Sequence, residues 1–306
     1  MSEIKTLKSK NFTWFSIYDA KADEINFLRK KFHFHELDLE DAYAKKQSQR
    51  PKIDVRENYI FLVFLFPYYN AILKKIEPKE LDVFITKDHF ITLQNIHKGE
   101  VTNFFAECQK KPNLIKGTPF YALYQILNRL YKICFPMLDH ISLDINHIED
   151  NIYAKKERQI VEKILAVKRN IMNFLKIMQP HKRILRKIST DNFSFSQTEK
   201  ELPIWYNDLI DLTKNIWDTL ANYQQTIDNL EDTNNILVSF KLNDIMKTLT
   251  IFSVIVFPLT LMAAIFGMNV ADMPIVGSPN DFWIILTIML IASICMFSYF
   301  RHKKWF

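Results

Sequence analysis

Two long uncharged stretches lie near the C-terminal end of the chain. Residues 249–268, LTIFSVIVFPLTLMAAIFGM, and 282–300, FWIILTIMLIASICMFSYF, contain no charged side chain. Each is long enough to cross about 30 Å of hydrocarbon as a helix, for which roughly 20 residues suffice. The alternative is a pair of buried core helices in a soluble protein. In a chain otherwise dense in charge, we interpret the two stretches as membrane spans.

Shorter apolar runs with polar punctuation occupy the first 118 residues. The runs at 59–66, 81–86 and 89–94 (YIFLVFLF, LDVFIT and HFITLQ) are typical of strands. The stretches 20–31 and 101–110 are typical of helices. The pattern predicts an α/β domain over residues 1–118.

Helical periodicity dominates the next region, 119–248. Apolar residues recur at spacings of three and four from Phe120 to Lys187, which predicts two or three long helices before a polar linker at 189–200. From Pro203 no glycine or proline occurs until Pro258, so one long helix is expected to run from a stalk into the first span. The fold class is therefore α+β: an N-terminal α/β domain, a long-helix stalk and a transmembrane hairpin over 249–306.

The distribution of charge predicts the topology. The chain has 40 basic and 34 acidic residues among 306, and their interleaving indicates no nucleic-acid binding. The loop between the spans carries two acids and no base, whereas lysines precede the first span and the tail after the second is basic. By the positive-inside rule, the body and both termini are expected in the cytoplasm. The first 15 residues lack the apolar segment of a secretory signal.

Sequence signatures of catalysis are missing. The chain has four glycines and no phosphate loop, dinucleotide-binding glycine pattern, HExxH or GxSxG, so no enzyme activity is expected. The three cysteines are too widely spaced for a zinc or redox motif. The pairs His33/His35 and His140/His147 could each hold a metal, the latter beside Asp139, Asp144 and Asp150, but solvated or partly buried histidines are the commoner case.

A stripe of polar, small and apolar residues follows one face of the first span. Its members recur at intervals of three or four: Asn243, Met246, Leu249, Ser253, Phe257, Thr260 and Ala264. Copies of such a helix around an axis would line a narrow pore. A helix-packing seam of small residues is the alternative, and the stripe by itself does not distinguish the two.

The end of the first span carries a more specific motif. Gly267, Met268 and Asn269 are followed by Met273-Pro274, and PLT (258–260) and LNDIMKTLT (242–250) lie upstream. With the segment HELDLEDAYAKKQSQRPKIDVRENYIFLVF (35–64) and the terminal RHKKWF, the chain resembles the CorA family of Mg²⁺ channels over essentially its whole length. Departures are Phe266 before the glycine, Ala264 at a position where glycine is common, Ile275 in the outer loop, and the absence of an acid from FPYYNAILKK.

The resemblance implies roles for several residues. A selectivity filter is expected at Gly267, Met268 and Asn269, with Asn243 forming a polar ring and Met246 and Leu249 an apolar constriction. Family members form homopentameric funnels that sense intracellular Mg²⁺ at carboxylates between subunits. The corresponding stalk acids here are Asp208, Asp211 and Asp232.

These expectations combine into one functional hypothesis. We expect a homopentameric inner-membrane channel for Mg²⁺, and for Co²⁺ or Ni²⁺, with Mg²⁺ as cargo and regulatory ion and no other cofactor. Its partners are the lipid bilayer and copies of itself. The alternatives are a Zn²⁺ transporter on the same fold and a membrane-anchored scaffold or sensor without transport.

Overall fold

The computed structural model describes residues 3–43, 50–94, 99–115, 117–152, 157–191, 193, 201–268, 275, 277 and 280–303. The chain divides into two compact units, Met1–Glu231 and Asp232–Phe306. The described strands all belong to the first unit, and the uncharged segments 249–268 and 282–300 belong to the second.

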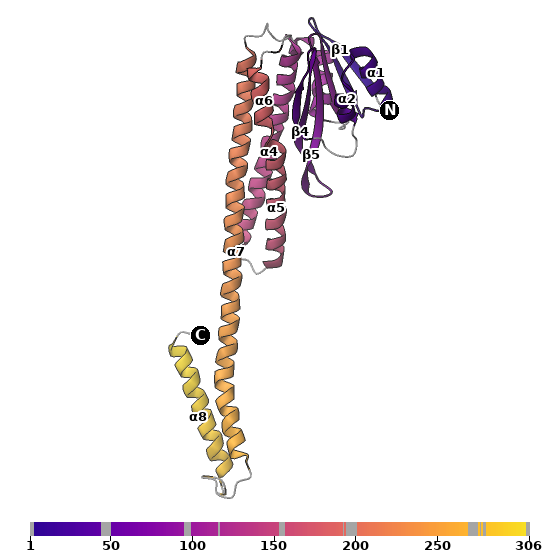
Figure 1. Cartoon of the computed structure of the whole chain (residues 1–306). Coiled ribbons are helices and arrows are strands. Elements are labelled where there is room, and N and C mark those ends of the chain that lie inside the picture. The colour runs from indigo at the N-terminus through magenta and orange to yellow at the C-terminus, as the bar shows by residue number, and fades with distance from the viewer. Residues whose placement is uncertain are drawn as a thin grey trace. The chain divides into compact units, whose positions relative to one another are not determined.

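A six-stranded sheet forms the centre of the first unit, with strand order β1-β2-β6-β5-β4-β3 (Figure 1). Neighbouring strands are antiparallel except β2 and β6, which are parallel. The strands are β1 (Glu3–Lys8), β2 (Thr13–Tyr18), β3 (Lys52–Val55), β4 (Tyr59–Asn70), β5 (Lys75–Thr86) and β6 (His89–Gln94). The strands predicted at 59–66, 81–86 and 89–94 are confirmed as β4, β5 and β6. The strands β4 and β5 are longer than predicted.

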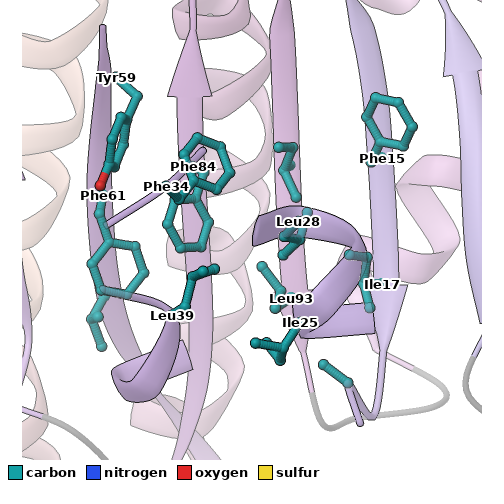
Figure 2. Packing of buried hydrophobic residues seen from close by; sticks show 13 residues of the cluster. Phe15, Ile17, Ile25, Leu28, Phe34, Leu39, Tyr59, Phe61, Phe84 and Leu93 are labelled. Atoms are coloured by element: carbon teal, nitrogen blue, oxygen red, sulfur yellow. The ribbon is translucent and has the colours of Figure 1, made fainter. Parts of the chain in front are cut away.

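The uninterrupted apolar run of β4 is explained by cover on both faces of the sheet. On one face, α1 (Ala22–Phe32) and α2 (Glu36–Tyr43) close a cluster that includes Phe61. Figure 2 shows Phe34 and Phe84 stacked there, with ring centroids 4.4 Å apart. On the other face, the ring of Phe64 contacts His181 of α6. A strand buried on both faces is apolar along its length and does not alternate apolar with polar residues.

The first unit contains further helices. They are α3 (Glu100–Lys110), the short 3₁₀ helix η1 (Pro112–Ile115), α4 (Pro119–Asn151), α5 (Glu157–Met178) and α6 (His181–Thr190). The predicted helices at 20–31, 101–110 and 120–187 are confirmed. At the start of α4, the Thr118 hydroxyl accepts a hydrogen bond from the Tyr121 N–H and Pro119 is the first helical residue. The domain boundaries expected at 118 and 248 stay predictions.

The long helix predicted from Pro203 is α7 (Leu202–Phe266), a single element of 65 residues. Pro203 is its second residue, where proline is tolerated because the first N–H groups of a helix have no intrahelical acceptor. The helix continues through Pro258. In the second unit, α8 (Asp281–His302) lies alongside the C-terminal part of α7 (Figure 1).

The apolar segments of α7 and α8 have little cover within the chain. Their most apolar 18-residue windows have mean hydropathies of 2.4 and 2.2, and 6% and 0% of these windows is buried. Phe252, Leu261 and Trp283 are each more than 60% exposed. Two buried helices of a soluble core would not expose such side chains, so the described residues favour membrane spans.

Candidate functional site

The stripe predicted on α7 lies on an uncovered face of the helix. Met246, Leu249 and Phe257 are 64%, 61% and 71% exposed, Asn243, Thr260 and Ala264 are exposed, and Ser253 is half-buried. These positions fall within an arc of about 120° at 100° per residue. Within this chain, the stripe is therefore open for most of its length.

The opposite face of α7 is the one that packs within the second unit. Its half-buried or buried positions are Ile251, Ile255, Leu259, Met262 and Phe266. The matching positions on α8 also recur at three and four: Ile285, Met289, Ala292, Ser293, Met296 and Phe300. At 100° per residue, the centre of the packed face of α7 lies about 170° from the centre of the stripe. The packing of α7 in the hairpin with α8 thus leaves most of the stripe uncovered.

Two hydroxyl groups of the stripe are bonded to their own helix. Ser253 Oγ donates to the Leu249 carbonyl at 3.0 Å, and Thr260 Oγ1 donates to the Val256 carbonyl at 2.9 Å. Each hydroxyl proton is thereby used, and the oxygen lone pairs remain as acceptors. This arrangement suits a ring that accepts hydrogen bonds from the waters around a cation.

The predicted filter begins where α7 ends. The Gly267 N–H donates to the Ala263 carbonyl at 3.0 Å, and the Met268 N–H donates to the Ile265 carbonyl at 3.2 Å, so the helix tightens in its last turn. A Cβ at position 267 would lie 3.1 Å from the Ala263 oxygen, a crowded distance that glycine avoids. Met268 is 58% exposed. Asn269, the third filter residue, lies outside the described residues.

The motif at the end of α7 agrees with a comparison of the whole chain. Residues 9–302 match the family described as CorA-like Mg²⁺ transporter protein. The chain belongs to this CorA family. It is 28% identical over 299 residues to the cobalt/magnesium transport protein CorA of Thermotoga maritima, a match that covers 96% of this chain and 83% of the relative.

A second relative connects sequence and fold. The cobalt/magnesium transport protein CorA of Methanocaldococcus jannaschii is 24% identical over 302 residues, covering 95% of this chain and 90% of that one. The complete structure of the CorA magnesium transporter from M. jannaschii superimposes with a TM-score of 0.86, covering 98% of this chain and 93% of the other at 21% identity. The expected fold is thereby confirmed from the N-terminal α/β domain to the two apolar helices.

Family membership also fixes the class of activity. CorA proteins are membrane transporters of divalent cations, so this chain is a transporter and the expectation that it is not an enzyme is confirmed. The two apolar helices at its C-terminal end are the membrane part of such a protein.

The stalk acids expected to sense Mg²⁺ are exposed. Asp208 and Asp211 lie one turn apart on α7, and Asp208 Oδ2 accepts a hydrogen bond from the Tyr124 hydroxyl at 3.3 Å. Burial, and then the Asp208 charge, raise the pKa of Tyr124. Asp232 lies 21 residues after Asp211 and belongs to the second unit. The sequence pattern does not single out Tyr124 because its contact with Asp208 spans 84 residues.

No group of three or more metal-ligating side chains assembles among the residues that the structure describes. The histidine pairs have other roles. His33 caps the C-terminus of α1 with a φ of 56°, and His35 Nδ1 accepts from the Leu37 N–H at 3.2 Å. The His147 ring is 3.2 Å from the Asn151 amide nitrogen. His140 is exposed, and the interpretation of these histidines as ordinary solvated or capping residues stays a prediction.

Proposed function

We propose that this protein is a homopentameric channel of the inner membrane that passes Mg²⁺, and also Co²⁺ and Ni²⁺, passively into the cytoplasm. Both termini would be cytoplasmic, and intracellular Mg²⁺ would close the pore. The magnesium and cobalt in the names of its relatives support this choice of ions. Moving two charges through a potential of 100 mV supplies about 4.6 kcal/mol, so inward flux requires no ATP hydrolysis.

One observation carries the proposal: the stripe of α7 is open on the side opposite the face that packs within the hairpin. A single helix cannot enclose a path. Copies of α7 around an axis can enclose one and still keep α8 on the outside, since the two faces are about 170° apart. A membrane tether needs no such open stripe with acceptor hydroxyls.

The ion chemistry suits Asn269 at the mouth of that path. Mg²⁺ gives up its waters reluctantly and prefers octahedral oxygen geometry. A ring of neutral amide carbonyls can accept hydrogen bonds from those waters without removing them. Gly267 and Met268 would place the ring. Nearer the proposed cytoplasmic end of the span, Met246 and Leu249 would form an apolar constriction that closes the pore by excluding water.

Regulation by Mg²⁺ is proposed at the stalk acids. Asp208 and Asp211 are exposed and one turn apart, so a neighbouring subunit could complete a site there. Repulsion between carboxylates at a subunit boundary would oppose closure until Mg²⁺ neutralises it.

The pore and the packing seam make different predictions for water access. In a Cys295→Ser background, we expect Ser253→Cys and Thr260→Cys to react with a charged, membrane-impermeant thiol reagent and to lose Mg²⁺ uptake. Cys108 and Cys134 are buried and stay as they are.

The matched control for this labelling experiment is Phe252→Cys, which lies on α7 outside the stripe and is 69% exposed. We expect it neither to react nor to change uptake, because its side chain would face lipid. Labelling of Phe252→Cys, with Ser253→Cys and Thr260→Cys protected, would show that the stripe is a seam between helices. In the Zn²⁺ alternative, Zn²⁺ rather than Mg²⁺ would give the larger flux through unlabelled protein.

A further inference from the structure

A cleft in the first unit has no place in the transport mechanism. Its volume is about 820 Å³, and it lies between the β4–β5 hairpin, the end of α5 and the start of α6. Pockets that hold small organic ligands typically measure about 300–1,000 Å³. The cleft is thus large enough for a whole metabolite rather than a single ion.

The charge of the cleft is positive. Lys75, Lys176, Arg50 and Arg183 line it, with Glu77 as the acid among its lining residues. Lys75 Nζ lies 2.9 Å from Glu77 Oε1, so these two charges offset each other. Hydrogen bonds from Asn70 and Lys75 lower the pKa of Glu77 and keep it ionised.

The other three cations have no carboxylate partner in the part of the chain that the structure describes. Arg50, Lys176 and Arg183 are exposed and form no ion pair there. Three unneutralised cations around one cavity favour a multiply charged anion. Arginine is especially suited to phosphate because its planar guanidinium can donate two parallel hydrogen bonds.

Buried and partly buried hydrogen bonds hold the walls of the cleft in place. The Ile76 N–H donates to Asn170 Oδ1 at 3.0 Å, and Asn173 Nδ2 donates to the Ile76 carbonyl at 3.1 Å. These bonds join α5 to β5. At the other wall, His181 Nε2 is 2.7 Å from the Leu65 carbonyl of β4. A preformed site loses less conformational entropy when a ligand binds.

Apolar side chains line the remainder of the cleft. They include Leu65, Ile76 and Ile177, with Pro51, Pro78 and Pro180. Inorganic phosphate or triphosphate would leave this surface in water. A ligand with an apolar ring system and a phosphate tail would use both parts of the lining.

We propose that this cleft binds a nucleoside di- or triphosphate, with the phosphates on Arg50, Lys176 and Arg183 and the base against the apolar wall. The residues that line the cleft include no member of the stripe, of the filter or of the stalk acids. The proposal therefore does not rest on the transport function.

Isothermal titration calorimetry on the full-length protein in detergent tests the proposal, with EDTA present to remove divalent cations. We expect ATP to bind with a Kd below about 1 mM and sodium triphosphate to bind at least about tenfold more weakly, a difference of about 1.4 kcal/mol from the apolar wall. Affinity for ATP should fall as salt is raised, since the contacts are largely ionic.

The variants localise the site. Lys176→Gln together with Arg183→Gln should weaken ATP binding at least about tenfold. Lys182→Gln together with Arg186→Gln is the matched control, because these exposed side chains lie on α6 but do not line the cleft. No heat from ATP, equal affinity for ATP and triphosphate, or an equal loss in both double variants would each overturn the proposal.

Discussion

At the scale of single residues, Asp82 is an acidic side chain buried in the sheet of the first unit. It lies in the middle of β5, between Val63 of β4 and Leu93 of β6, and is 5% exposed. Its Oδ1 atom has no hydrogen-bond partner among the described residues. Burial, followed by the neighbouring Glu80, raises the pKa of Asp82 well above its usual value. Lys52, on the same row of the sheet, is paired with Asp41 and Asp54 instead.

This burial predicts the pH dependence of one variant. Because the folded-state pKa of Asp82 is raised, the folded protein favours the protonated form, and ionisation of the side chain destabilises the fold as pH rises above the unfolded-state pKa. Asp82→Asn should therefore raise the melting temperature at pH 8, by the equivalent of about 1 kcal/mol or more, with the gain shrinking toward pH 4.

Thermal unfolding of the full chain in detergent, followed by tryptophan fluorescence, measures this effect. Asp88→Asn, in an exposed turn, is the control and should leave the melting temperature nearly unchanged at both pH values. A lower melting temperature for Asp82→Asn at pH 8 would mean that the ionised carboxylate stabilises the fold.

At the scale of elements, the long apolar runs were predictable and the pairing of strands was not. The runs of β4, β5 and β6 are apolar because both faces of the sheet are covered, and this composition is visible in the sequence. The parallel pairing of β2 with β6 joins Thr13 to His89, residues that no local pattern connects. The burial of Asp82 was equally hidden, since an acid in a strand is usually a solvent-facing residue.

The stripe of α7 likewise has one feature that the sequence predicts and one that it does not. Its period of three to four predicts a shared helix face, and in the structure that face is uncovered except at the half-buried Ser253, while the role of its residues in a pore stays a prediction. Which face of α7 packs against its neighbour in the hairpin depends on the positions of both helices. That information is absent from the sequence of α7 alone.

The constriction proposed on α7 makes a prediction about leak. Leu249→Ser or Met246→Ser should raise Mg²⁺ flux at high internal Mg²⁺, because a polar ring holds water where an apolar ring excludes it. Phe252→Ser is the control on the same helix and should not raise flux. Flux into proteoliposomes loaded with Mg²⁺ measures the leak, and unchanged flux in both stripe variants would locate the gate elsewhere.

At the scale of the whole molecule, the proposed closure by Mg²⁺ would require several sites to act together. With 1 mM Mg²⁺ and a closed-state affinity of about 0.1 mM, each occupied site contributes about 1.4 kcal/mol, so one site shifts the equilibrium modestly and five shift it strongly. We expect Asp208→Asn with Asp211→Asn to weaken both the protection of the soluble unit from protease by Mg²⁺ and the inhibition of flux.

The charge-matched control for that double variant is Asp144→Asn with Asp150→Asn, two exposed positions on α4. It should behave as the unaltered protein in both assays. Proteolysis and flux curves that superimpose for the stalk variant and the unaltered protein would show that closure relies on other residues.

Uptake of Mg²⁺ into proteoliposomes under an imposed inside-negative potential tests the central claim most directly. We expect uptake that grows with the potential, and a loss of at least about tenfold in Asn269→Ala, because that variant removes the carbonyls that accept hydrogen bonds from the hydrated ion. Asn280→Ala is the matched control, since Asn280 precedes α8 and its side chain makes no capping bond. Full uptake by a folded Asn269→Ala protein, or no potential-dependent uptake by the unaltered one, would contradict the account.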